Sequence, residues 1–284
     1  MQDFRDSWYL TWQRLLPQHL LSRIAGRLAE ARVPWLRRRL IRAAIRRFGI
    51  DLAEAAEPDC ENYASFNDFF TRALVTGARP LAGDARTLVS PADGTISEAG
   101  RLTGNRLLQA KGRMFTLEAL LGESGTRAAG LHDGSFVTIY LSPRDYHRVH
   151  MPLSGSLIAT RYIPGRLFSV NLRTARALPG LYAGNERLVC WFDTPAGNVA
   201  VVLVGALLVA GIDTVWRQGA YPAGRLCEER FAQGQVVLER GAELGRFRFG
   251  STVIVLMPEG VALSTAVAGA PVRMGEELAR CRCA

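Results

Sequence analysis

The sequence predicts an α+β protein in which amphipathic N-terminal helices precede a mainly antiparallel, β-sandwich or barrel-like domain. Apolar residues recur at helical spacing through the first 48 residues. From about residue 86 the pattern changes to short β-rich runs separated by glycine and proline. The chain has 284 residues, 48% of them hydrophobic, which is enough for a substantial core. We place the basic helical region at residues 1–75 and the β-rich domain at residues 76–284.

Helices are expected across residues 4–48, where one face is apolar and the other is almost wholly arginine. Pro17 and Pro34 should interrupt them, because proline does not fit inside a helix. Residues 51–75 should hold another short helical stretch. Ser65 is its expected N-cap, since a serine side chain can accept a backbone N–H of the first turn.

Positive charge is concentrated at the N-terminus. Residues 1–50 contain eleven arginines and three acidic residues, so +8 of the chain's net charge of +9 lies there. Trp8, Tyr9, Trp12 and Trp35 accompany these arginines. A basic amphipathic helix with interfacial aromatics suits the headgroup region of an anionic bilayer, which is the interpretation we favour. The alternatives are a helix packed on its own domain with a solvated basic face and, third, nucleic-acid binding, for which no motif is present.

The β-rich region should contain several short strands, and no segment is long enough to span a bilayer. The longest apolar run, 199–212, is interrupted by two glycines and falls short of the roughly 20 residues that a spanning helix needs. The expected strands are 136–141, 157–162, 188–192, 199–204, 207–212, 235–238 and 252–256.

The cysteines and the N-terminus indicate a reduced, cytosolic setting. Five cysteines at irregular spacing do not form a disulfide framework. Cys281 and Cys283 lack a second ligand pair nearby, so we interpret them as part of a C-terminal tail. No signal peptide is expected, because the first residues are polar and acidic.

Four short segments could carry chemistry, although each has an ordinary explanation when taken alone. Ser90–Gly94 has the composition of a turn, and Lys111 is the only lysine. His147 and His150 are spaced as His-x-x-His, but without a neighbouring carboxylate and on opposite faces of a strand they form a weak metal signal. No metal site is therefore expected. Ser251 should lie where a turn enters a strand.

Taken together, Asp93, His150 and Ser251 supply an orienting carboxylate, a base and a nucleophile. Gly250 tolerates the strained backbone needed for the Ser251 hydroxyl to attack the carbonyl of its own neighbour. The ester formed in this way can break by β-elimination, leaving dehydroalanine, which hydrolyses to a pyruvoyl group and ammonia. The same three side chains could instead serve a membrane-associated serine hydrolase, although the glycines of a nucleophile elbow are missing.

In these motifs the chain resembles the phosphatidylserine decarboxylase family, bacterial proenzyme type, and the resemblance extends nearly end to end. The Asp145–His150 block is the most specific, and Phe249 stands where the family pattern has leucine. The matching segments are 66–72, 90–94, 109–112, 141–152, 168–171, 185–187, 204–206 and 249–252.

The resemblance implies that Asp93, His150 and Ser251 form a charge relay for self-cleavage between Gly250 and Ser251. A β chain of residues 1–250 and an α chain of residues 251–284 would result, and a homodimer of this αβ unit is left open. Ser251 would become a pyruvoyl group that forms a Schiff base with phosphatidylserine and yields phosphatidylethanolamine and CO2. His147 would assist substrate binding or decarboxylation. The expected location is the cytoplasmic face of the bacterial cell membrane, bound peripherally to its anionic surface.

The chemistry of decarboxylation agrees with this resemblance. Loss of CO2 from an α-amino acid headgroup leaves a carbanion that needs an electron sink, which a pyruvoyl group can supply as pyridoxal phosphate does elsewhere. Pyridoxal phosphate would need Lys111, and no glycine-rich phosphate loop accompanies it. A non-enzymatic, membrane-binding β domain is the remaining alternative.

Overall fold

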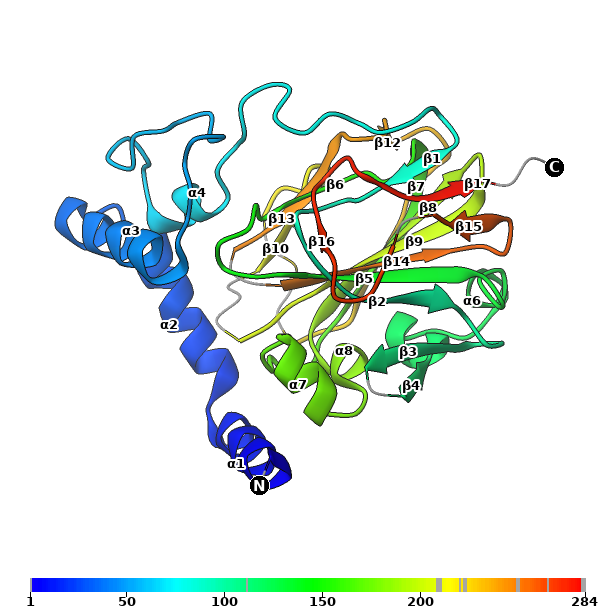
Figure 1. Ribbon diagram of the computed structural model, residues 1–284, viewed down its shortest axis with the longest axis horizontal. Coiled ribbons are helices and arrows are strands. Elements are labelled where there is room, and N and C mark those ends of the chain that lie inside the picture. The colour runs from blue at the N-terminus through cyan, green and yellow to red at the C-terminus, as the bar shows by residue number, and fades with distance from the viewer. Residues whose placement is uncertain are drawn as a thin grey trace.

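The N-terminal helices precede and flank the β-rich part of the chain in a computed structural model (Figure 1). The structure describes residues 2–110, 112–207, 211–219, 221, 224–248, 251–264 and 266–281, with side chains from residue 8 onward. The helices of the N-terminal region are α1 (Gln2–Leu15), α2 (Gln18–Glu30), α3 (Pro34–Phe48) and α4 (Phe66–Phe70). Among the described residues, no helix is both long and apolar enough to cross a membrane.

The predicted interruptions at Pro17 and Pro34 and the predicted cap at Ser65 are confirmed. Pro17 occupies the N-cap position of α2, and Pro34 is the first residue of α3, where its missing N–H costs nothing. Gly49 ends α3 in the left-handed conformation, with φ 65°. The Ser65 hydroxyl accepts the backbone N–H of Asp68 at 3.1 Å, as expected of a serine cap.

A nine-stranded antiparallel sheet forms the centre of the β-rich part. Its order is β11-β7-β8-β9-β14-β5-β2-β16, and β12 pairs with β7. The strands do not close into a barrel over the residues described. The strands are β2 (Gly94–Arg101), β5 (Ser135–Leu141), β7 (Gly155–Ile163), β8 (Arg187–Thr194), β9 (Gly197–Val204), β11 (Cys227–Arg230), β12 (Val237–Leu238), β14 (Ser251–Met257) and β16 (Pro271–Val272).

Smaller sheets and short helices accompany this sheet. One small sheet has the order β1-β17-β15 and another the order β10-β13-β6, while β3 and β4 form a hairpin. The strands are β1 (Thr87–Val89), β3 (Arg106–Ala110), β4 (Arg113–Thr116), β6 (Arg148–His150), β10 (Ile212–Thr214), β13 (Glu243–Phe247), β15 (Val261–Leu263) and β17 (Glu277–Cys281). The helices are α5 (Leu117–Leu121), α6 (Thr126–Ala129), α7 (Leu172–Ala177) and α8 (Leu181–Gly184).

Strand β14 is buried on both faces, which makes the large sheet a middle layer. Val253 and Val255 pack into a core shared with β1, β6, β13 and β17. Ile254 and Leu256 point the other way, into a core shared with α5, α7, α8 and the β3–β4 hairpin. Figure 1 shows these helices on one side of the sheet and the small sheets on the other. The mainly antiparallel fold class is thus confirmed.

Most predicted strands are present, and one differs. Residues 252–256 lie within β14, and 199–204 lie within β9. For the expected strand 207–212, Leu207 lies in a turn and β10 begins only at Ile212. Residues 208–210 lie outside the described residues. Glycine at 205 and 211 interrupts the apolar run, and the strand following β9 is accordingly not its direct hairpin partner in the sheet.

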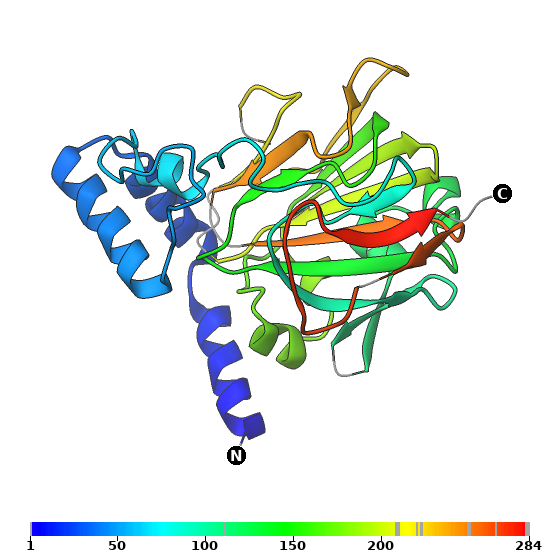
Figure 2. The same ribbon diagram turned by 45° about the horizontal axis from the view of Figure 1, so that its top comes forward.

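The N-terminal helices are attached to the β-rich part through glutamine side chains. The Gln13 side-chain oxygen accepts the backbone N–H of Ser169, and that of Gln18 accepts the N–H of Leu167, both at 2.8 Å. Helix α1 also contacts α7, and in Figure 2 it is the dark blue helix that extends below the other N-terminal helices. The division at residue 75 remains a prediction.

Candidate active site

Ser251 is the first residue of β14 and lies opposite Leu141, the last residue of β5. Its side chain is fully buried, and within the described part of the chain its Oγ has no hydrogen-bond partner. A buried hydroxyl without a partner costs about 1–3 kcal/mol and is uncommon in a core. Gly250, the other residue of the predicted cleavage site, lies outside the described residues.

Backbone hydrogen bonds join the turn that holds Asp93 and strand β13 to the segment that holds His147 and His150. The His150 N–H donates to the carbonyl of Pro91 at 2.7 Å, which fixes the Asp93 turn against the strand. On the other edge of β6, the Phe247 N–H donates to the carbonyl of His147 at 3.1 Å. Strand β13 therefore carries the chain past His147 shortly before it reaches Ser251.

His147 is a fully buried, neutral imidazole with one free nitrogen. Its Nδ1 lies 2.8 Å from the Asp145 carbonyl, which can only accept, so Nδ1 carries the proton. Its Nε2 has no hydrogen-bond partner among the described residues. Burial lowers the pKa of His147 to about 3, with a smaller contribution from the positive charge of Arg72. The Phe70 ring, 4.0 Å away between centroids, packs against the imidazole. The Nε2 of His147 is thus a buried proton acceptor that solvent does not reach.

His150, in contrast, uses both ring nitrogens. Nδ1 donates to the Gly241 carbonyl at 2.8 Å, and Nε2 accepts the Tyr146 hydroxyl at 2.9 Å. Burial lowers the pKa of His150. Burial also raises the pKa of Tyr146 to about 12, which keeps the phenol protonated and able to donate. The ring is therefore neutral and held in one orientation.

Asp93 is held by Arg79. The guanidinium donates from Nε to Oδ1 at 3.0 Å and from Nη2 to Oδ2 at 2.6 Å, while the Met274 N–H donates to Oδ1 at 2.8 Å. Within the described ranges no hydrogen bond joins Asp93, His150 and Ser251 to one another. The fold brings their segments together, and the charge relay remains a prediction.

Arg72, which is not among the predicted site residues, is also buried beside this site. Its side chain is only 5% exposed, and its Nε and Nη1 have no partner among the residues described. Burial lowers the pKa of this guanidinium, and the negative charges of Asp93 and Asp145 act in the opposite direction. Arg79 was missed as well. Arg72 lies in segment 66–72, which matches the family pattern, so the resemblance could have pointed to it. Arg79 lies outside the matching segments, and no local sequence pattern distinguishes it.

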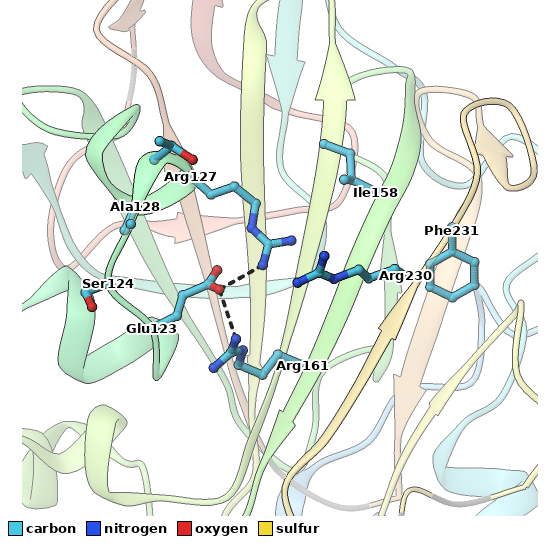
Figure 3. A pocket seen from close by; sticks show the side chains of 10 residues that line it. Glu123, Ser124, Arg127, Ala128, Ile158, Arg161, Arg230 and Phe231 are labelled. Atoms are coloured by element: carbon cyan, nitrogen blue, oxygen red, sulfur yellow. Dashed lines mark hydrogen bonds and ion pairs between the residues drawn. The ribbon is translucent and has the colours of Figure 1, made fainter.

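A different polar pocket, of about 590 Å³, lies on β7, β11 and the α5–α6 connection (Figure 3). Arg127 and Arg161 both reach Glu123, at 2.8 and 3.1 Å, as the dashed lines in Figure 3 show. Arg161 and Arg230 also reach Glu228. Because these guanidiniums are paired, we interpret the pocket as an ion-pair network that joins the elements around it. In the described part of the chain, no group of three His, Cys, Asp or Glu side chains could hold a metal ion.

Comparison with known proteins gives the class of enzyme. The sequence model of the family described as phosphatidylserine decarboxylase matches residues 66–280, and a second model, described as PSD, matches residues 10–49. A protein of Pseudomonas aeruginosa is 50% identical, with 98% of each chain covered. One of Bordetella avium is 50% identical over 98% of this chain and 96% of its own, and one of Alcanivorax borkumensis is 50% identical over 92% and 90%. Each carries the name phosphatidylserine decarboxylase proenzyme.

These matches make the protein an enzyme, and specifically a decarboxylase. The chain belongs to the phosphatidylserine decarboxylase family. The resemblance drawn from the sequence motifs is thus confirmed.

Proposed function

We propose that this protein cuts its own chain between Gly250 and Ser251, converts Ser251 into a pyruvoyl group and decarboxylates phosphatidylserine to phosphatidylethanolamine. The observation that carries the proposal is the buried Ser251 Oγ, which has no hydrogen-bond partner among the residues that the structure describes. It lies at the start of a core strand in a chain whose relatives are named as proenzymes.

The self-cleavage uses atoms that the chain itself provides. Ser251 Oγ attacks the carbonyl carbon of residue 250, and the peptide bond becomes an ester. Loss of the Ser251 Cα proton then breaks the Cβ–Oγ bond, which frees the carboxylate of residue 250 and leaves dehydroalanine. Water replaces the nitrogen, which leaves as ammonia, so that residue 251 ends as a pyruvoyl group. The products are a β chain of residues 1–250 and an α chain of residues 251–284.

Asp93 and His150 are the proposed relay for this cut. His150 is neutral and therefore able to accept the Ser251 proton, and its Nε2 is the nitrogen that faces a hydroxyl, that of Tyr146. For His150 to act on Ser251, the serine must replace Tyr146 or transfer its proton through the phenol. Burial lowers the pKa of His150, and the negative charge of Asp93 acts in the opposite direction.

The pyruvoyl group fits the surroundings of Ser251, because a fully buried position excludes water from a reactive carbonyl. When formed, it supplies the electron sink for the electrons left by departing CO2. His147 is the proposed proton carrier of this reaction, since its free Nε2 can accept the proton that the substrate ammonium gives up. The same nitrogen can return that proton to the carbon that loses CO2.

The N-terminal helices provide the proposed membrane contact. The exposed fractions of Trp8, Trp12 and Trp35 are 61%, 54% and 63%. Other large apolar side chains exposed on this region are Leu15, Leu20, Ile24, Leu28 and Val33. Arginines near an anionic surface contribute about 1 kcal/mol each to adsorption. We propose peripheral binding at the cytoplasmic face of the bacterial cell membrane and leave open a homodimer of the αβ unit.

A denaturing gel with mass spectrometry tests the proposal. Purified protein should give a large fragment that ends at Gly250 and a small one of residues 251–284. The small fragment should lack a free amine and should be lighter by one ammonia than the serine-terminated peptide. Ser251→Ala should remain one inactive chain. An active enzyme whose chain stays intact at Ser251 would overturn the pyruvoyl mechanism and favour the serine-hydrolase alternative.

A further inference from the structure

A polar pocket of about 560 Å³ lies between α2 and the β-rich part of the chain. Helix α2 contributes His19, Arg23 and Arg27, and the other side contributes Glu186 and Arg248. Arg248 lies three residues before Ser251, so this pocket adjoins the segment that carries the proposed cleavage site.

The cations of this pocket are of two kinds. Arg248 is already paired, with both oxygens of Asp213 at 2.9 and 3.1 Å and with Glu30 at 3.0 Å. Arg23 and Arg27 make no hydrogen bond or ion pair within the part of the chain that the structure describes. Unpaired guanidiniums at the edge of a pocket are suited to bind an anion, and the fork of donors on arginine matches phosphate and carboxylate oxygens.

A second pocket, of about 330 Å³, continues from the first one between α2 and α3. The two pockets share Gly26 and Arg248. Apart from Arg47 and Arg248, the second pocket is lined by apolar residues and the shared glycine: Ala25, Gly26, Leu28, Ala29, Leu40, Ala43, Ala44, Phe48 and Phe66. The second pocket is therefore an apolar cavity that meets the polar, arginine-containing pocket at Gly26 and Arg248.

The apolar pocket also opens toward the proposed membrane surface. Leu28 lines it and is 47% exposed. Ile24 and Leu20, one and two turns earlier on α2, are exposed as well and continue the same apolar stripe. An apolar chain could pass from the bilayer along this stripe into the pocket.

We infer that the two pockets are subsites for one glycerophospholipid. Arg23 and Arg27 bind the anionic headgroup in the polar pocket, and one acyl chain occupies the apolar pocket between α2 and α3. This inference rests on the proposed function for the identity of the headgroup. The mixed charge of the polar pocket, with unpaired arginines and the carboxyl of Glu186, matches a phosphoserine headgroup, which carries two anionic groups and an ammonium.

Binding to the full-length Ser251→Ala chain tests the inference without any reaction. Calorimetry should be run with monomeric dioctanoyl phosphatidylserine, with glycerophosphoserine and with inorganic phosphate. The added substitutions R23Q and R27Q together should weaken both serine ligands about tenfold or more, as expected when charge-assisted hydrogen bonds are lost. Filling the apolar pocket with A25L and A43L should weaken dioctanoyl phosphatidylserine alone.

The matched control is R106Q with R176Q, which removes the same charge from exposed arginines of β3 and α7 that have no ion pair among the described residues. Control binding should equal that of the parent chain. Absent binding of dioctanoyl phosphatidylserine, unchanged binding by the R23Q/R27Q variant, or equal affinity for inorganic phosphate would each overturn the inference. Cleavage of the wild-type chain is scored separately on a gel, so a failure of the proposed function is distinguishable from a failure of these subsites.

Discussion

Arg79 and Asp93 form a two-point contact, Nε to Oδ1 at 3.0 Å and Nη2 to Oδ2 at 2.6 Å, with both side chains largely buried. The hydrogen bonds that Arg79 donates to Asp93 raise the pKa of Arg79, so the guanidinium stays charged. A buried pair of this kind is strongly destabilised when one partner is removed, because the other charge is then left without compensation. Arg79 therefore positions the carboxylate that we propose to orient His150.

Arg79→Gln should slow self-cleavage by about tenfold or more, because the Asp93 carboxylate loses its fixed orientation and its charge partner. The rate can be followed on a denaturing gel after synthesis of the protein in a cell-free system. Arg273→Gln is the matched control, since Arg273 is 60% exposed and pairs with Glu54 instead of Asp93. Processing of Arg79→Gln at the rate of this control would show that Asp93 needs no such support.

Substitutions of His150 and His147 should affect different steps, the first self-cleavage and the second decarboxylation. His150→Ala and Asp93→Asn should leave the chain uncut, since each weakens the activation of Ser251. His147→Ala should still be cut and should decarboxylate poorly, because it loses the free Nε2 that we propose carries the proton. Fragment ratios on a gel and release of labelled CO2 measure the two steps.

His132→Ala serves as control for this pair, because His132 is exposed and lies 3.8 Å from Glu118, on other elements. It should be both cut and active. Normal maturation of His150→Ala would assign the base elsewhere, with His147 the first residue to test.

The sequence predicted contacts between residues that are close in the chain, but it did not predict contacts between distant residues. Ser65 caps the N–H of Asp68, and Pro34 begins α3, because both act within one helical turn. Gln13 accepts the N–H of Ser169, 156 positions away, and no local pattern announces such a partner.

The orientation of the histidines was also beyond the sequence. The sequence motif identified His147 and His150 as candidate site residues. Their tautomers, however, depend on the carbonyls of Asp145 and Gly241, and Gly241 lies 91 positions from His150. Alternation along a strand predicts that the two rings point apart, and this stays a prediction, because His147 precedes β6 and lies outside it. Which ring keeps a free nitrogen follows only from packing, as when Phe70 covers His147.

The tryptophans of the N-terminal helices should determine membrane binding. Replacing Trp8, Trp12 and Trp35 with alanine should reduce flotation with anionic vesicles, because exposed interfacial aromatics are lost while the arginines remain. Binding that remains should be more sensitive to salt than that of the wild type. Trp191→Phe, inside the core, is the control for loss of a large aromatic. Equal flotation of the triple variant and the wild type at low and high salt would place the membrane contact elsewhere.

The stability of the uncut chain should fall as the pH falls below the ordinary pKa of histidine. Burial depresses the pKa of His147 from 6.5 to about 3, so the unfolded chain binds a proton in this interval that the folded chain does not. The stabilisation is fully present above pH 6.5 and is lost as the pH falls toward 3. One such group gives a slope of about 1.4 kcal/mol per pH unit in the free energy of unfolding. The pKa of His150 is also lowered, which adds a slope of the same sign.

Urea unfolding of the Ser251→Ala chain between pH 7.5 and 5 measures this dependence, because a single chain avoids the dissociation of fragments. Adding His147→Asn should make the slope shallower by up to one proton. If His147→Asn leaves the slope as steep as that of the parent chain, then His147 titrates alike in both states. It would then be open to solvent in the folded protein, and the buried proton acceptor that we propose for decarboxylation would not exist.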